Sequence, residues 1–281
     1  MQPGNKIVNA LWIGNILSPT ELLTIKSFVD NGHEFILWAY DEISTALPKG
    51  AVLKDANAIF PRKNVFCYKY SNQFGHGKGS YAGFSDIFRY KLLYLKGGWW
   101  TDMDVTCLKP LDFDDEYVFR THHSLPMVGN IMKCPPNSKL MQKCFEQAVK
   151  KVDQNNRDWH LPIQILIDNV YALELDKYIR NFSNQDSWNI IRKFLKKTEP
   201  VPENWYVIHW VNEEWRRNKI SKSSFKKNSL IFKLFQKHKI EVKAAKPLNS
   251  ILINMKLSKV SFATHFISSQ KLSSLKLLRS K

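Results

Sequence analysis

The run GGWWTDMDV at residues 97–105 constrains this chain most, because it sets two carboxylates two residues apart directly after a pair of glycines. Apolar residues flank the acids and favour an extended segment, on which alternation directs Asp102 and Asp104 to the same side. Two such carboxylates repel each other unless a cation joins them, and Mg²⁺ or Mn²⁺ suits oxygen ligands that bridge to a phosphate. A metal-assisted diphosphate site is one interpretation, and a solvated turn with two exposed acids is the other.

The residues before this run predict an α/β fold. Residues 6–14 and 33–40 have the pattern of strands, and a helix between them begins at Ser18, with Pro19 in its first turn, and ends at Gly32. A strand, a helix and a strand of these lengths indicate a βαβ unit and a parallel sheet.

Further elements follow from the same periodicities. We expect helices over residues 82–96, 137–152 and 165–175, a late strand over residues 205–210, and irregular structure over residues 41–80. With 281 residues the chain is long enough to bury a full core.

The cysteines and the apolar segments bear on the compartment. The four cysteines lack metal-ligand spacing, so we expect free, buried thiols in a reducing compartment. We expect no signal peptide and no transmembrane helix, because no long apolar stretch occurs. The cysteines are Cys67, Cys107, Cys134 and Cys144.

Charge is distributed very unevenly along the chain. Of the net charge of +17, residues 216–281 carry +16, with 17 Lys and Arg and a single acid, Glu241. A catalytic domain over residues 1–216 followed by a basic region over residues 217–281 is the division we expect.

The basic region mixes lysine with large apolar residues. Helical spacing occurs at Ile231, Leu234 and Phe235, in the apolar stretch 248–257, and at four leucines near the end. Basic amphipathic segments of this kind bind anionic membrane surfaces. A helical subdomain with a solvated basic face is one alternative, and nucleic-acid binding is another, although no recognised nucleic-acid motif accompanies the charge and we expect no such partner. The four leucines are Leu272, Leu275, Leu277 and Leu278.

Asp86 and Arg89 lie three residues apart on the expected helix 82–96 and so share one face. Such a pair is most often a surface ion pair. About a dozen residues before two metal-type carboxylates, however, an acid and a guanidinium can together bind vicinal sugar hydroxyls, because one accepts hydrogen bonds and the other donates them.

Residues 84–105, FSDIFRY followed after six residues by GGWWTDMDV, resemble the sugar-binding region containing the DXD motif of GT-A glycosyltransferases. The nearest types are bacterial surface-polysaccharide transferases and outer-chain mannosyltransferases, with clostridial glucosylating toxins more remote. Trp100 replaces the usual tyrosine. Residues 11–14 are similar to the opening of the family, and residues 208–215 are loosely similar to its last motif. The resemblance implies a GT-A type Rossmann-like mixed sheet flanked by helices.

The resemblance also implies roles for the acids and for their partner. Asp104 is implied as the direct metal ligand, and Asp102 as a ribose contact or a water-mediated metal contact. Asp86 and Arg89 are implied as contacts to the donor sugar or diphosphate, and Arg89, Asp102 and Asp104 form the expected catalytic set. Which group completes the metal shell stays open among His209, Asn212 and Glu214, and His209 is the one we name.

Several aromatic residues are implied in donor binding. Trp12, at the end of the first strand, is implied as a flat surface for the base. Tyr40, Trp100 and Trp215 are the other donor-binding candidates. Asp41 beside Tyr40 is a weaker one.

The expected function is metal-dependent transfer, with Mn²⁺ or Mg²⁺, of a hexose or N-acetylhexosamine from a nucleotide-sugar. A UDP-sugar comes first as donor and a GDP-sugar second. The acceptor is a hydroxyl of a cell-surface glycan, such as a lipopolysaccharide, a capsule or a lipid-linked sugar. Transfer with retention is implied, in the cytoplasm at the inner face of the cytoplasmic membrane.

Two other classes of protein compete with this prediction. One is a toxin or effector glucosyltransferase that modifies a protein, and the other is a basic nucleic-acid-binding protein without enzyme activity. An inverting enzyme would need a general base near the acceptor, for which Asp158, His160 and Asp168 are available. His122 and His123 could suggest zinc, but we expect a loop or structural role for them.

Overall fold

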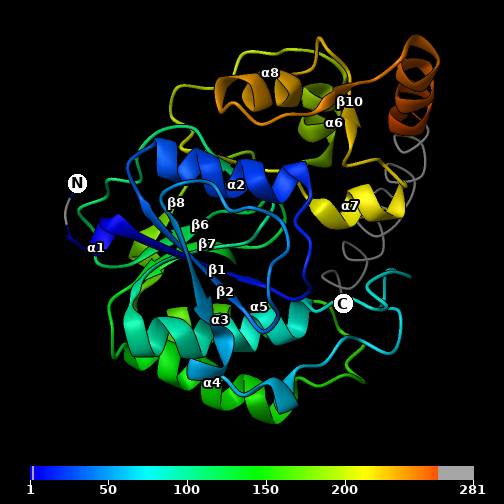
Figure 1. Cartoon of the computed structure of the whole chain (residues 1–281). Coiled ribbons are helices and arrows are strands. Elements are labelled where there is room, and N and C mark those ends of the chain that lie inside the picture. Colours follow the sequence, from blue (N-terminus) through cyan, green and yellow to red (C-terminus); the bar gives the residue numbers. More distant parts are fainter. Residues whose placement is uncertain (2, 259–281) are drawn as a thin grey trace, which may run out of the picture. The chain divides into compact units, whose positions relative to one another are not determined.

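The computed structural model describes residue 1 and residues 3–258, so the four leucines near the C-terminus lie outside the described residues. The chain divides into two compact units (Figure 1). The first unit comprises Met1–Asp186 and Val201–Trp210, and the second comprises Ser187–Pro200 and the residues from Val211 onward. The expected functional division after residue 216 stays a prediction.

A seven-stranded mixed sheet forms the centre of the first unit, in the order β3-β2-β1-β4-β7-β6-β8. Strands β3, β2, β1 and β4 run parallel, β7 runs antiparallel to both β4 and β6, and β8 pairs parallel with β6. The expected α/β fold with a mixed sheet is confirmed. The strands are β1 (Ile7–Trp12), β2 (Glu34–Ala39), β3 (Ala51–Asp55), β4 (Gly98–Thr101), β6 (Val118–Arg120), β7 (Val128–Cys134) and β8 (Ile179–Arg180).

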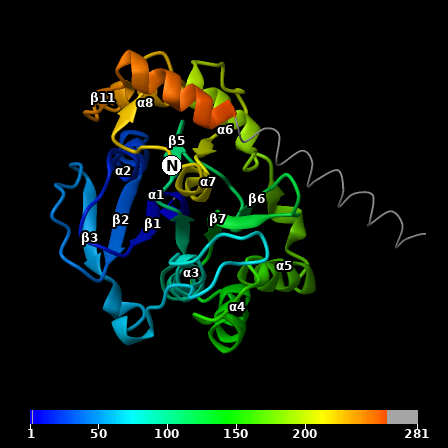
Figure 2. The ribbon, with the colours of Figure 1, turned by 90° about the vertical axis from the view of Figure 1, so that its right-hand side faces the viewer.

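Helices cover both faces of this sheet (Figures 1 and 2). Helix α2 (Pro19–Asp30) buries Ile25 and Phe28 in a core on one face. Helices α3 (Ala82–Lys96), α4 (Lys139–Lys151) and α5 (Leu161–Ala172) share a second core on the other face. The unit also holds a short N-terminal helix, α1 (Pro3–Lys6), and three 3-10 turns, η1 (Ala56–Ala58), η2 (Arg62–Asn64) and η3 (Asp176–Tyr178).

The helix ends follow local sequence signals. The Glu21 carboxylate accepts the backbone N–H of Ser18 at 2.8 Å, and Pro19 occupies the first turn of α2. Gly32, with φ of +86°, follows the end of the helix, where a side chain would be strained. The expected irregular stretch 41–80 is wrong in one part, because β3 extends the sheet there.

The strand order reverses beside β1, since β2 pairs on one side of it and β4 on the other. In open α/β sheets, ligands bind at the carboxyl ends of the strands where the order reverses. Trp12 ends β1, and Asp102 directly follows β4. The topology therefore marks the edge of the sheet that carries the predicted motif.

The second unit contains α6 (Trp188–Lys196), α7 (Asn212–Arg217), α8 (Leu230–Lys237) and a small parallel pair, β10 (Ser224–Phe225) with β11 (Lys243–Ala244). Residues 247–258 are also helical. One face of this last helix buries Leu257, whose carbonyl accepts a hydrogen bond from Arg192 at 2.9 Å. The other face exposes four apolar side chains, Leu248, Ile251, Leu252 and Met255.

Over the part of the chain that the structure describes, none of the helices combines the length and the apolar character needed to span a bilayer.

Candidate active site

The two acids of the motif lie in a turn and not on a strand. Strand β4 ends at Thr101, and β5 (Val105–Cys107) leaves the large sheet to pair with β9 (Val207–His209). Because the chain changes sheets between Asp102 and Asp104, the expectation of an extended segment is wrong. The backbone N–H of Asp102 is anchored on the carbonyl of Asn130 in β7 at 2.7 Å.

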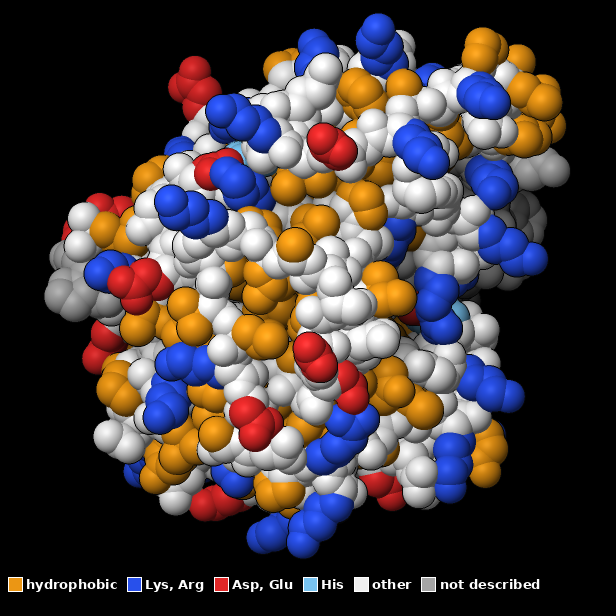
Figure 3. All heavy atoms as spheres, viewed as in Figure 1, with side chains coloured by type: hydrophobic (Ala, Val, Ile, Leu, Met, Phe, Trp, Pro, Cys, Tyr) orange, Lys and Arg blue, Asp and Glu red, His pale blue; other side chains and the backbone are white. Residues whose placement is uncertain are grey.

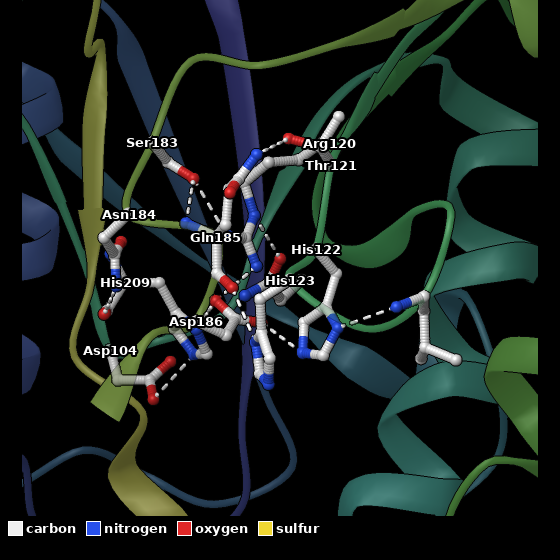
Figure 4. Close-up of polar contacts among 12 residues, drawn as sticks. Asp104, Arg120, Thr121, His122, His123, Ser183, Asn184, Gln185, Asp186 and His209 are labelled. Atoms are coloured by element: carbon white, nitrogen blue, oxygen red, sulfur yellow. Dashed lines mark hydrogen bonds and ion pairs between the residues drawn. The ribbon is translucent and has the colours of Figure 1, made fainter. Parts of the chain in front are cut away.

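Pairing of β5 with β9 brings His209 to Asp104 from a distant part of the chain. Val105 is opposite His209 in the antiparallel register, and the backbone N–H of Trp210 donates to the carbonyl of Asp104 at 2.8 Å. His209 Nε2 then lies 3.1 Å from Asp104 Oδ2 (Figure 4). Asn184 holds the backbone of His209 from the other side, donating to its carbonyl and accepting its N–H, each at 2.9 Å.

The Asp104–His209 pair fits a divalent cation. Two adjacent ligands in an octahedral shell with bonds of about 2.1 Å lie about 3.0 Å apart, which is close to the separation of the His209 nitrogen and the Asp104 oxygen. Among the described residues, no three His, Cys, Asp or Glu side chains are gathered as a ready-made metal cage. Mg²⁺ and Mn²⁺ commonly take their remaining ligands from water and substrate phosphates, so two protein ligands are compatible with a site for either ion.

Asp102 is held apart from that pair. The indole N–H of Trp100 donates to its Oδ1 at 2.8 Å, and Arg89 Nη2 lies 3.9 Å from the same oxygen. Burial, and then the charge of Asp104, raise the pKa of Asp102, against the effect of Arg89. This placement agrees with a less direct role than that of Asp104, which stays a prediction.

Arg89 and Asp86 form a buried ion pair on α3 and not a surface pair. The guanidinium also lies over the Trp100 ring, 5.4 Å from its centroid. Burial raises the pKa of Asp86 to about 6, although Arg89 opposes the rise. Taking an ion pair out of water is costly unless close geometry and further hydrogen bonds offset the loss of hydration.

Three buried N–H donors around the motif find no hydrogen-bond acceptor within the described part of the chain, namely Arg89 Nε, Asn130 Nδ2 and Trp12 Nε1. An unsatisfied buried donor costs free energy, so each calls for an explanation. A ligand rich in hydroxyl and phosphate oxygens would supply the missing acceptors.

Two polar residues that sequence reasoning missed complete the cluster. Asp186 Oδ1 lies 2.6 Å from His209 Nδ1 and accepts a hydrogen bond from Arg120 Nη2 at 2.5 Å (Figure 4). Arg120 ends β6 and is fully buried. An arginine at the end of the apolar run YVF was the only signal, since a buried arginine needs a partner, and nothing in the sequence marked Asp186.

The charged groups of the cluster shift one another's pKa values. Burial alone would lower the pKa of His209, but Asp104 and Asp186 outweigh it and raise that pKa to about 10. Burial would raise the pKa of Asp186, but Arg120 and His209 hold it well below its usual range. The two carboxylates therefore favour the charged form of the His209 ring.

The adjacent histidines behave differently from a zinc pair. His122 Nδ1 accepts the backbone N–H of Ser124 at 3.1 Å and of Leu125 at 3.2 Å. Its Nε2 lies 3.7 Å from Asp186 Oδ2, and burial lowers its pKa to about 4. His123 turns to the carbonyl of Gln185.

The aromatic candidates occupy different settings. Trp12 is half-buried at the end of β1. Trp100 is buried, and its indole N–H is engaged by Asp102. The hydroxyl of Tyr40 donates to the carbonyl of Phe60 at 2.7 Å. Trp215 is buried in the second unit, where its ring centroid lies 6.2 Å from that of Phe225.

One comparison with known proteins covers part of this cluster. Residues 25–122 match the family described as "Glycosyltransferase sugar-binding region containing DXD motif", a span that includes Asp86, Arg89, Asp102 and Asp104. The chain therefore contains this sugar-binding region and is an enzyme of the glycosyltransferase class. No curated protein sequence matches it.

Two solved structures are similar to the chain at low identity. The first is "PaToxG Glycosyltransferase", 15% identical, with a TM-score of 0.44 over 60% of this chain and 68% of that one. The second is a transferase solved as a mutant with cysteines replaced by serine, 10% identical, with a TM-score of 0.41 over 73% of this chain and 94% of that one.

Proposed function

We propose that the protein is a divalent-metal-dependent hexosyltransferase or N-acetylhexosaminyltransferase that uses a nucleotide-sugar, with UDP-sugars before GDP-sugars. The observation that carries this proposal is the 3.1 Å spacing of His209 Nε2 and Asp104 Oδ2 beside the buried Asp86–Arg89 pair. The spacing suits two ligands of one cation, and the pair suits a ligand with hydroxyl and phosphate oxygens.

Different residues of the protein would bind the metal, the sugar or diphosphate, and the base of the donor. Asp104 and His209 would hold Mn²⁺ or Mg²⁺, and the cation supplies charge stabilisation for the departing diphosphate when it is bound. Arg89, whose buried Nε finds no acceptor among the described residues, donates to donor oxygens, while Asp86 accepts from sugar hydroxyls. Trp12 offers a flat surface for the base at the end of β1. In keeping with the family resemblance, we propose transfer with retention.

We propose a glycan or glycolipid of the cell surface as acceptor, and binding of the protein to an anionic membrane surface at the inner face of the cytoplasmic membrane. The charge of +16 over residues 216–281 and the exposed apolar stripe on residues 247–258 support this proposal. An exposed stripe of Leu, Ile and Met within a strongly basic region has the chemistry of an interfacial helix. Figure 3 shows hydrophobic side chains gathered over this helix with Lys and Arg around them.

Donor turnover tests the central proposal. The purified full chain is incubated with UDP- and GDP-sugars in Mn²⁺, in Mg²⁺ or in EDTA, and release of the nucleoside diphosphate is measured. We expect metal-dependent release from at least one donor, reduced on the order of 100-fold or more in Asp104→Ala, as when stabilisation of developing charge is lost.

Glu34→Ala is the matched control, because Glu34 on β2 forms an exposed ion pair with Lys6. It should leave turnover unchanged. Absence of metal-dependent turnover with every donor would contradict the proposal. Transfer to a protein such as a small GTPase, and not to a glycan, would favour the toxin or effector alternative.

A further inference from the structure

We propose that Asp186, held by Arg120, is a positioning residue that presents His209 Nε2 to the metal. This inference rests on the proposed function, because it assigns how that metal ligand is prepared. It adds two side chains to the site. Asp186 lies outside the matched residues 25–122, and Arg120 lies within them but is not part of the DXD motif.

Asp186 meets His209 on the ring nitrogen opposite the metal side. The Nδ1–Oδ1 distance is 2.6 Å, while Nε2 faces Asp104 Oδ2 at 3.1 Å. A carboxylate only accepts hydrogen bonds, so Asp186 retains the proton on Nδ1, and Nε2 is the nitrogen that releases its proton when it binds a cation. Metal-ligating histidines commonly have such a carboxylate on their other nitrogen.

Arg120 in turn fixes Asp186. Its guanidinium is fully buried and donates to Asp186 Oδ1 at 2.5 Å, to Ser183 Oγ at 2.8 Å and to Asn130 Oδ1 at 2.9 Å. Asn130 also anchors the backbone of Asp102 through its carbonyl. The central sheet thus supports the acid turn and the carboxylate behind His209 through one residue of β7.

The second oxygen of Asp186 faces another nitrogen donor. His122 Nδ1 accepts two backbone N–H groups, so the proton of the neutral ring is on Nε2, which faces Asp186 Oδ2 at 3.7 Å. Nitrogens of Arg120, His122 and His209 therefore surround Asp186 (Figure 4). These nitrogens hold the Asp186 carboxylate in place on the Nδ1 side of His209, so it does not contact Nε2.

The backbone is shaped for this placement. Gln185 and Asp186 both have left-handed conformations, with φ of +49° and +60°, which side chains other than glycine adopt at a cost. Asn184, one residue earlier, binds the backbone of His209 through both ends of its side-chain amide. Residues 184–186 therefore fix both the backbone and the ring of His209.

Manganese affinity tests this assignment without reliance on turnover. Binding of Mn²⁺ to the full chain with saturating UDP is measured by calorimetry and by electron paramagnetic resonance of free Mn²⁺. We expect Asp186→Asn, which keeps the shape and removes the charge, to weaken Mn²⁺ binding about 10- to 100-fold. Thermal unfolding of the metal-free variant verifies that it folds.

The matched control is Asp115→Asn, since Asp115 forms a partly exposed ion pair with Arg180 in the same unit, at 2.8 Å. It should bind Mn²⁺ as the wild type does. Should Asp186→Asn fail to fold, Asp186→Glu retains the charge but moves the carboxylate, and we expect binding at least about threefold weaker than wild type.

The outcomes separate the two levels of the account. If the wild type binds no Mn²⁺, the proposed function itself fails. If the wild type binds Mn²⁺ and the folded Asp186 variant binds it equally well, the proposed function stands and the positioning role of Asp186 is overturned.

Discussion

At the scale of single residues, the candidate site consists of buried charged groups, one of which has a donor without a hydrogen-bond acceptor in the described part of the chain. Arg89 is paired with Asp86 and lies over Trp100, yet its Nε has no acceptor among the residues that the structure describes. His209 is held between two carboxylates. Burial strengthens the interaction of each such group with a charged ligand, because water no longer competes for it. In the proposed function, a nucleotide-sugar supplies the acceptors that these residues lack.

Gly129 on β7 leaves the space that Arg89 occupies. A Cβ at residue 129 would lie 2.7 Å from Arg89 Nη1, so Gly129→Ala must displace the guanidinium. Displacement of a positioning group by about 1 Å can cost on the order of 100-fold in rate, and we expect kcat/KM for the donor to fall about 10- to 100-fold. Steady-state kinetics measure the loss, and thermal unfolding verifies that the variant folds.

Gly4→Ala provides the control for a glycine substitution in the same unit. A Cβ at Gly4 would have ordinary contacts, the nearest being the Lys133 Cε at 3.6 Å. Unchanged kinetics in Gly129→Ala would show that Arg89 does not contact the donor.

At the scale of elements, the site depends on where one strand leaves the large sheet. Strand β4 belongs to the seven-stranded sheet and β5 to the pair with β9, so the acids lie at the junction of two sheets. That junction places His209, from a late strand, next to Asp104. Alternation along a strand could not predict this, because the turn is set by pairing with a strand far along the chain.

Elements with strong local signals were predictable from the sequence. The β1–α2–β2 unit follows from Ser18, Pro19, Glu21 and Gly32, and α4 lies within the helix expected over residues 137–152. Strand β3 was missed because it is only five residues long and its apolar run, AVL, ends at Leu53. Helix α5 begins at Leu161, ahead of the expected start at residue 165, because Pro162 is tolerated in a first turn.

That the DXD pair, Asp86, Arg89 and His209 lie near one another was also predictable, since a local motif or a loose resemblance marked each one. Asp186 and Arg120 were not, because their roles come from contacts between residues 66 positions apart. No pattern of residue types within one element encodes such a contact.

At the scale of the whole molecule, most of the net charge and one exposed apolar stripe lie in the same part of the sequence. Residues 216–281 carry nearly all the net charge, and Leu248, Ile251, Leu252 and Met255 form one exposed stripe within them. Attraction to anionic lipid and burial of the stripe in the interface add to each other. The charge and the stripe together are the basis for proposing that this region binds a membrane surface.

Vesicle binding tests that role on the full chain. We expect cosedimentation with vesicles containing anionic phosphatidylserine, and little with purely zwitterionic vesicles. Ile251→Asn with Met255→Asn should weaken binding about 10-fold or more, because burial of each apolar side chain is worth about 1.5–3 kcal/mol.

Ile16→Asn with Val149→Asn is the matched control, since these residues are 65% and 46% exposed in the first unit, against 57% and 50% for Ile251 and Met255. The control should bind as the wild type does. Equal binding by the stripe variant would contradict the membrane proposal while leaving the enzyme class intact.

Anomalous X-ray scattering from crystals grown with UDP and Mn²⁺ tests the central claim most directly. The account predicts a manganese peak at about 2.1–2.2 Å from both an Asp104 carboxylate oxygen and His209 Nε2, with further ligands from the diphosphate and water. A peak elsewhere, or UDP bound with no manganese at Asp104 and His209, would contradict it.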